Sequence, residues 1–107
     1  MKIETIDILA NEYFDKVNGN SYFNANIYLN YDSPNSVKIH IPFEYGYNNQ
    51  YIQTATNKLN ELKYINTAEP LWWYCRENNI ALRTNKQEGF KQRELKQQDK
   101  DLIALTL

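Results

Sequence analysis

Apolar and polar residues alternate from residue 3 to residue 17, which predicts a strand with one buried face. Asn18-Gly19 follows directly, and this dipeptide is the strongest short signal for a two-residue hairpin turn. Such a turn pairs Val17 with Asn20 and places apolar or aromatic residues opposite one another on a single face. The expected pairs are Phe14–Phe23, Ala10–Ile27, Ile8–Leu29 and Ile6–Tyr31.

A third strand is predicted over residues 37–43, after a segment rich in turn-forming residues at 32–36. Pairing it with the second strand continues the same buried face. The expected pairs are Tyr31–Val37, Leu29–Ile39, Ile27–Ile41 and Ala25–Phe43. Because Pro42 has no amide hydrogen to donate to a ladder, this strand should lie at an edge of the sheet.

The apolar period changes to that of an amphipathic helix over residues 50–63. Its apolar stripe contains Tyr51, Ala55, Leu59 and Leu62, and Asn48 or Asn49 can cap it. A second, shorter helix is expected at about 68–78, with Asn66 or Thr67 as its cap, Pro70 in its first turn and Asn78-Asn79 at its end.

Alternation returns at residues 80–85 and predicts a fourth strand. The order β-β-β-α-α-β indicates an α+β fold, with an antiparallel sheet of three to four strands and the helices packed on one face. We assign residues 1–95 to this single domain. Residues 96–107 form a C-terminal tail whose order the pattern leaves open.

Charge and cysteine content narrow the class of protein. The formal net charge is -1, which argues against a non-specific nucleic-acid binder and equally against an acidic mimic of DNA. One cysteine in 107 residues excludes an intramolecular disulfide and suits a reducing cytoplasm. No apolar run approaches 18 residues, so no membrane span is expected.

The inventory of reactive side chains predicts a protein that is not an enzyme. The chain has one histidine and one cysteine, too few for a zinc site, and its three glycines are isolated, so no phosphate-binding loop exists. Cys75 is expected to be buried beside Leu71, and His40 to be solvated on the outer face of an edge strand. We therefore expect no catalytic residue, no metal and no cofactor.

The predicted register turns a set of tyrosines and asparagines out together on the face away from the helices. Tyrosine offers contact area at low entropic cost, and asparagine offers adaptable hydrogen bonds, as recognition surfaces require. The expected members include Tyr13, Tyr22, Asn24, Asn26, Tyr28, His40 and Glu44. The alternatives are a purely solvated face or a face covered by the C-terminal tail.

Trp72 and Trp73 are adjacent on the second helix, about 100° apart, so we expect one to pack and the other to reach a boundary or a partner. A nucleic-acid interface would combine these aromatic rings with nearby cations. Its candidate residues are Arg76, Arg83, Lys91, Arg93 and Lys96.

Four segments together resemble a family of small proteins encoded by bacteriophages and prophages. They are FDKVNGNSYF (14–23), PFEYGYNNQYIQTA (42–55), WYCRENNI (73–80) and KQREL (91–95). Asn48-Asn49 stands where that family's pattern has a glycine, and residues 96–107 match none of it. The resemblance implies a phage origin and a workplace in the cytoplasm of the infected bacterium, and it transfers no functional residue.

Two functions follow as expectations. The first is a phage accessory protein that binds and blocks a host protein, for example an anti-CRISPR or another inhibitor of a defence nuclease. The alternative is a nucleic-acid-binding accessory or regulatory protein. Binding that weakens steeply with salt would mark the second, and a salt-tolerant complex with a protein would mark the first.

Overall fold

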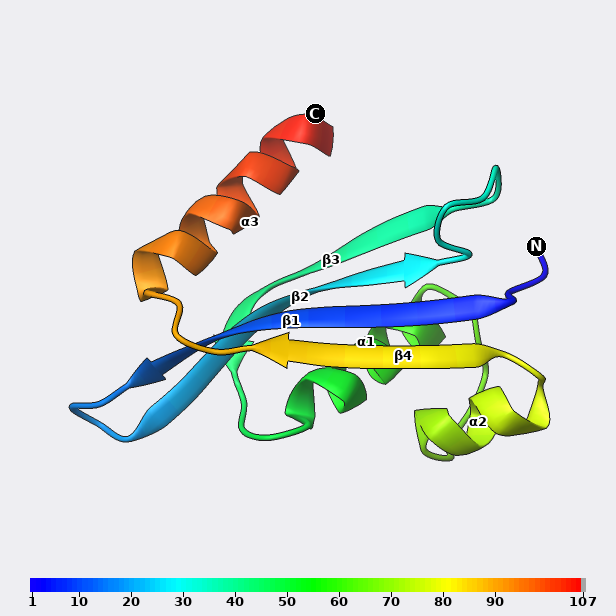
Figure 1. Cartoon of the computed structure of the whole chain (residues 1–107), viewed down its shortest axis with the longest axis horizontal. Coiled ribbons are helices and arrows are strands. Elements are labelled where there is room, and N and C mark those ends of the chain that lie inside the picture. Colours follow the sequence, from blue (N-terminus) through cyan, green and yellow to red (C-terminus); the bar gives the residue numbers. More distant parts are fainter. Residues whose placement is uncertain (107) are drawn as a thin grey trace.

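The structure is a computed structural model that describes the backbone of residues 1–106 and the side chains of residues 1–102. It is an α+β fold with a four-stranded mixed sheet (Figure 1). The elements are β1 (Thr5–Asp15), β2 (Asn20–Leu29), β3 (Val37–Tyr45), α1 (Gln50–Glu61), α2 (Leu71–Glu77), β4 (Ala81–Gln87) and α3 (Gln92–Thr106). The strand order is β3-β2-β1-β4, so Pro42 does lie on an edge strand, as expected.

The sheet is mixed because β4 runs parallel to β1, which corrects the expectation of a purely antiparallel sheet. After β3 the chain crosses the sheet through α1 and α2 and returns to the end where β1 begins. There Ala81 pairs with Thr5, and Ala81 N–H donates to the carbonyl of Glu4 at 3.0 Å. A strand that starts beside the start of β1 must run in the same direction.

The first hairpin keeps the expected faces but not the expected register. Ile6 pairs with Leu29 and Asp15 with Asn20, so the pairing is offset by two residues and the turn contains four residues instead of two. An offset of two leaves each side chain on its predicted face. Phe14 and Tyr31 nevertheless lose their predicted core positions and are 48% and 61% exposed.

A bulge in β3 changes the face of its last residues. Ala25 pairs with Ile41 but Phe23 pairs with Glu44, so two residues of β3 lie opposite Asn24. Phe43, predicted to lie in the core, therefore points to the outer face. Glu44, predicted to lie on the outer face, points to the helices, where it accepts a hydrogen bond from the Thr54 hydroxyl at 3.0 Å.

α1 and α2 cover one face of the sheet, and the core lies between them. Ile6, Ile8, Ala10, Phe23, Ala25, Ile27, Leu29 and Ile41 pack there against Tyr51, Ala55, Leu59, Ile65, Leu71 and Cys75. The burial of Leu59 and Cys75 confirms two sequence predictions. Asn49 is the N-cap residue of α1, as one of the two candidates predicted, although its side chain makes no capping hydrogen bond. The N-cap residue of α2 is Pro70, so the prediction of Asn66 or Thr67 was wrong. Asn78 ends α2 as expected.

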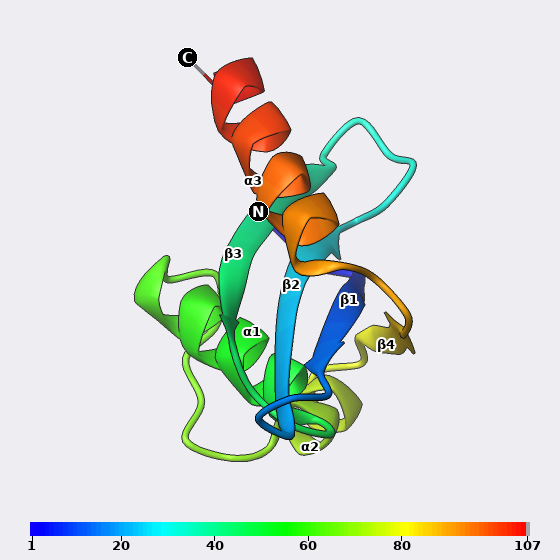
Figure 2. The same cartoon turned by 90° about the vertical axis from the view of Figure 1, so that its left-hand side faces the viewer.

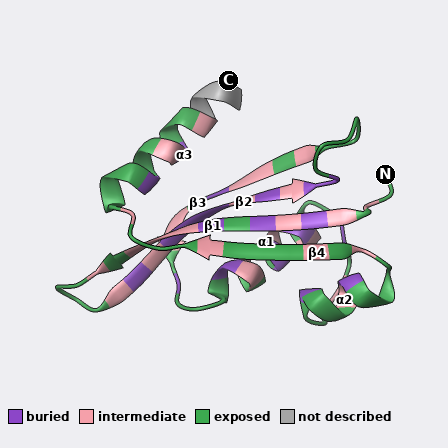
Figure 3. Ribbon diagram, viewed as in Figure 1, coloured by how far each residue is buried: buried purple, intermediate pink, exposed green. Residues whose placement is uncertain are grey.

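α3 lies on the opposite face of the sheet from α1 and α2 (Figures 1 and 2). The expectation of helices on one face alone was therefore wrong. The helix runs through residue 95, where the sequence pattern placed the end of the domain. Leu95 is fully buried against the sheet. Figure 3 shows the sheet buried in its centre, while β4 is largely exposed.

Within residues 1–106, no helix has the length and the apolar composition that crossing a lipid bilayer would require.

Candidate functional site

Five aromatic residues gather on the outer face at the hairpin end of the sheet. This aromatic patch consists of Tyr13, Tyr22, Phe43, Tyr45 and Tyr47. The ring of Tyr22 stacks on Phe43, with centroids 5.1 Å apart, and lies 6.1 Å from Tyr13. Tyr45 meets Tyr22 and Tyr47 edge to face, at 5.7 and 5.2 Å. Tyr45 and Tyr47 remain 53% and 42% exposed, so the patch presents apolar area and hydroxyls together.

The hairpin turn holds this patch in place. The Tyr47 hydroxyl lies 3.0 Å from the Gly19 carbonyl, to which it donates. Asp15 orders the turn, because its carboxylate accepts from the amides of Val17 and Asn18 and from the Asn18 side chain. The Asn18 side-chain bond is the main reason that the pKa of Asp15 is lowered. The patch therefore rests on a preorganised backbone.

The Tyr47 hydroxyl also changes the pKa of its neighbour Tyr45. Its interaction with Tyr45 raises the pKa of the Tyr45 hydroxyl, and the nearby Tyr22 adds to the same effect. Tyr45 is consequently a neutral phenol at physiological pH, able to donate a hydrogen bond to a partner.

α3 covers the next part of the outer face. Asp99, 8% exposed, accepts hydrogen bonds from the His40 ring at 2.6 Å and from the Asn24 amide at 3.1 Å. Asn24 is 1% exposed and also donates to the Leu95 carbonyl. His40 was expected to be solvated and is instead enclosed, with its other ring nitrogen 2.8 Å from Asn26 Oδ1.

The predicted partner-binding residues thus fall into three groups. Tyr13 and Tyr22 belong to the aromatic patch. Asn24, Asn26 and His40 contact each other or α3, so the alternative of a face covered by the C-terminal segment applies to this part. Tyr28 lies near the end of β2 away from the hairpin turn, where it meets Tyr31 edge to face at 5.5 Å and Lys38 Nζ lies 5.7 Å from its ring.

Trp72 and Trp73 lie apart from that face, on α2. Both are exposed, at 58% and 37%, so the expectation that one of them packs was wrong. Leu71 and Cys75 are the buried residues of this helix. The guanidinium of Arg76 lies 5.3 Å from the Trp72 ring, a cation–π contact on the helix surface.

The candidate nucleic-acid residues do not form one surface. Arg76 is on α2, on the face of the sheet that α1 and α2 cover. Arg83 is on β4, where it makes a bidentate pair with Asp7 at 2.6 and 2.9 Å. This pairing raises the pKa of Arg83. Lys91 precedes α3, which carries Arg93 and Lys96, and Lys96 Nζ lies 5.2 Å from the Phe43 ring.

Two side chains that could take part in chemistry, Cys75 and Glu12, are buried or paired within the fold. Burial raises the pKa of the Cys75 thiol to about 11, which keeps it protonated and unreactive at physiological pH. Glu12 pairs with Lys86 at 2.7 Å, and both side chains are largely enclosed on the face of the sheet that α1 and α2 cover. No group of three or more possible metal ligands occurs among the side chains of residues 1–102.

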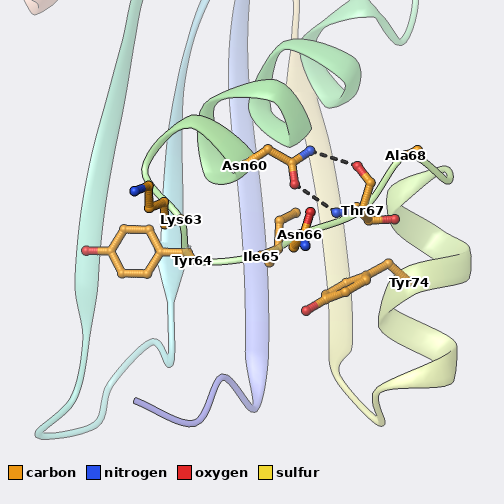
Figure 4. Close-up of a pocket in the computed structure, with 8 residues that line it drawn as sticks. All are labelled: Asn60, Lys63, Tyr64, Ile65, Asn66, Thr67, Ala68 and Tyr74. Atoms are coloured by element: carbon orange, nitrogen blue, oxygen red, sulfur yellow. Dashed lines mark hydrogen bonds between the residues drawn. The ribbon is translucent and has the colours of Figure 1, made fainter.

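A groove of about 750 Å³ lies along the segment that connects α1 to α2 (Figure 4). Its lining consists of Asn60, Lys63, Tyr64, Ile65, Asn66, Thr67, Ala68 and Tyr74. The Asn60 side chain bridges the loop, donating to the Thr67 carbonyl at 3.0 Å and accepting from the Thr67 amide at 2.9 Å. Lys63 is the one charged residue in this lining, so the groove carries no acid–base pair.

Sequence reasoning missed four residues of the outer face: Phe43, Tyr45, Tyr47 and Asp99. The alternating pattern placed Phe43 on the wrong face of the sheet, because alternation alone gives no sign of a bulge. Pro42 was the one residue nearby that could have indicated it. Tyr45-Gly46-Tyr47 breaks the alternation, and its two tyrosines were visible as aromatic residues next to an edge strand. Nothing local to Asp99 indicates a buried carboxylate, because its partners are 56 to 75 residues away.

Comparisons of the chain with protein-family models, with curated proteins and with solved structures each find no match.

Proposed function

We propose that this protein is a non-enzymatic binding domain whose aromatic patch docks on another protein. The single observation that carries the proposal is the array of stacked, partly exposed tyrosines held on a rigid sheet end. Aromatic residues dominate the energetic centres of protein interfaces, because they bury a large area with few rotatable bonds. Exposed tyrosines in this number contribute little to folding, whereas a partner would bury them.

A host protein is the partner that we propose, with blocking of that protein as the mode of action. The resemblance of four segments of the chain to small phage-encoded proteins supports this part of the proposal. An anti-CRISPR or another anti-defence inhibitor is the example that fits a chain of this size. His40 supports a role without catalysis, since both of its ring nitrogens already contact Asn26 and Asp99. A general base would need one nitrogen free to reach a substrate.

Nucleic acid is the less favoured partner. The basic residues are divided between α2, β4 and the α3 region, and Arg83 is neutralised by Asp7. Of the five, Lys96 alone contacts a ring of the aromatic patch. A surface that binds single strands combines several stacking rings with a continuous basic groove, and here the rings and most cations lie apart.

The test is a substitution at Tyr45 with a matched control at Tyr28. Tyr45→Ala should weaken binding of the host protein retained from nuclease-treated lysate by about 1–2 kcal/mol, as interface anchors do. Tyr28→Ala removes the same side chain from the same sheet face, near the other end of β2 and outside the aromatic patch, and should bind like the wild type. Both variants should keep the wild-type Tm.

Three results would contradict the proposal. The first is equal affinity of wild type and Tyr45→Ala in direct titrations of the purified partner. The second is loss of the partner on nuclease treatment, and the third is a steep decrease of binding between low and moderate salt, both of which favour the nucleic-acid alternative.

A further inference from the structure

β4 is an edge strand whose outer side is open. It pairs with β1 alone, and no element of the described chain lies beyond it (Figure 2). The Ala81 amide donates to the Glu4 carbonyl, so the odd-numbered residues of β4 turn their backbone groups toward β1. In a parallel ladder the backbone groups of the alternate residues then point away from the sheet. These residues are Leu82, Thr84 and Lys86, and within residues 1–102 their outward amides and carbonyls make no hydrogen bond.

The other edge of the sheet is protected, whereas β4 is not. β3 contains Pro42 and a bulge, and its Phe43 amide is taken by Asp99 of α3. All three features hinder the addition of a further strand. β4 contains no proline and pairs with β1 in one unbroken register over its whole length. Its outer side is therefore a regular template for another strand.

The two cations of β4 do not guard this edge. Arg83 is held by Asp7 in a bidentate pair at 2.6 and 2.9 Å. Lys86 Nζ lies 2.7 Å from Glu12 and donates to the Asn48 carbonyl at 2.8 Å. Unpaired charges on an edge strand repel a second strand. Here both charges are neutralised by carboxylates of β1, so this protection is absent.

An uncharged groove of about 320 Å³ lies next to the open edge. It is formed by α1, α2 and β4, and its lining includes Ile52, Trp72, Leu82 and Thr84 but no charged residue. Trp72 is 58% exposed. A chain that pairs with β4 would therefore cover apolar surface here without burying an unpaired charge.

We propose that β4 pairs antiparallel with β4 of a second copy of this chain, with Thr84 opposite Thr84 of that copy. Thr84 is the central residue of the strand. In this register the outward groups of Leu82, Thr84 and Lys86 all fall at hydrogen-bonded positions, so each finds a partner. A two-fold register centred on a neighbouring residue places some of them opposite residues outside the strand.

The side chains of this register are compatible with one another. Leu82 lies opposite Lys86 of the second copy, and Arg83 lies opposite Asn85, so no like charges face each other directly. The two Arg83 side chains are diagonal neighbours, but each is neutralised by its own Asp7. This self-complementarity favours a second copy over a strand of a different protein.

The two-fold axis of such a dimer is perpendicular to the sheet. Both aromatic patches would then lie on the same side of one continuous sheet, where a partner with two sites could bind both. The dimer itself does not depend on partner binding. Pairing of one short strand buries less than a standard interface, so we expect an affinity in the micromolar range.

Sedimentation and amide hydrogen exchange of the full chain test the proposal together. From low micromolar to several hundred micromolar protein, the average mass should rise toward that of a dimer. The amides of Leu82, Thr84 and Lys86 should become protected over the same range. The amides of Arg83 and Asn85 are the internal control, because they pair with β1 and should be protected at every concentration.

Two substitutions at the same position separate dimerisation from folding. Thr84→Pro removes an amide hydrogen that β1 does not use, so the sheet should persist while the dimer is lost. Thr84→Val keeps that amide and should dimerise like the wild type. Tyr45→Ala should also dimerise, which distinguishes this surface from the aromatic patch. Should Thr84→Pro fail to fold, amide exchange in the wild type still decides.

Three results would overturn the proposal. The first is a monomer at every concentration. The second is a dimer whose Leu82, Thr84 and Lys86 amides stay unprotected, or one that a folded Thr84→Pro variant still forms, since either places the contact elsewhere. The third is protection of these amides only when the purified host protein is added, which would assign the edge to a strand of that protein.

Discussion

Gly46 lies where β3 leads toward α1, at a point where the backbone passes a core ring. A Cβ atom there would lie 2.7 Å from Phe23 Cε1 and 2.8 Å from Gln50 Cγ. The Gly46 amide also donates to the Ser21 carbonyl at 3.0 Å, which fixes its backbone against β2. Any side chain must therefore displace Phe23, one of the largest fully buried residues.

Gly46→Ala should destabilise the protein by about 1–3 kcal/mol through overpacking. Urea denaturation of the single variant measures this loss. The double variant Gly46→Ala/Phe23→Leu lacks the ring atom that the new methyl group meets, so its loss should be smaller than the sum of the two single losses. Strict additivity would show that the ring and the glycine do not interact.

Residue-scale reasoning from sequence succeeded where burial follows from alternation or helical period, as for Ile27, Leu59 and Cys75. It failed for His40 and Phe43. The environment of His40 is created by Asp99, which is 59 residues away, and that of Phe43 by one extra residue in β3. Neither contact leaves a periodic signal in the chain.

At the scale of elements, turn chemistry decides the register. Asn18-Gly19 predicted a two-residue turn, but the carboxylate of Asp15 accepts three hydrogen bonds from Val17 and Asn18 and stabilises a four-residue loop. The element order and the inner face were predictable, because a shift of two residues preserves the pattern. The parallel direction of β4 was not, since alternation is the same for either direction.

α1 provides a test of how an element is anchored. Leu59 is fully buried against the sheet, whereas Leu62, at the C-cap, is 43% exposed. Leu59→Ala should cost about 2–5 kcal/mol, from lost transfer free energy and the cavity left behind. Leu62→Ala removes the same atoms and should cost well under half as much. Chemical denaturation of both variants gives the comparison, and equal losses would show that the helix face is assigned incorrectly.

At the scale of the whole molecule, the buried thiol couples stability to alkaline pH. The pKa of Cys75 is raised to about 11 by burial, while a thiol in an unfolded chain has a pKa of roughly 8.5. Unfolded chains therefore lose this proton first. The contribution is fully present below about pH 8.5 and is lost as the pH rises toward the folded pKa, by roughly 3 kcal/mol in all.

Cys75→Ala isolates this contribution from the tyrosines and lysines that titrate in the same range. Denaturation free energies between about pH 7 and 10.5 should decrease more steeply for the wild type than for the variant. Parallel curves would mean that the thiol ionises equally well in the folded protein. In the folded state at neutral pH, thiol reagents should label Cys75 only as fast as the protein opens.

β1 acquires its two neighbours at very different times during synthesis. β2 follows it after a four-residue turn, but Arg83 of β4, which pairs with Asp7, is 76 residues further along the chain. Until β4 has been made, β1 is an edge strand with open backbone amides beside a completed meander. During that interval, pairing of β1 with a second nascent chain competes with folding, and the arrival of β4 ends the competition.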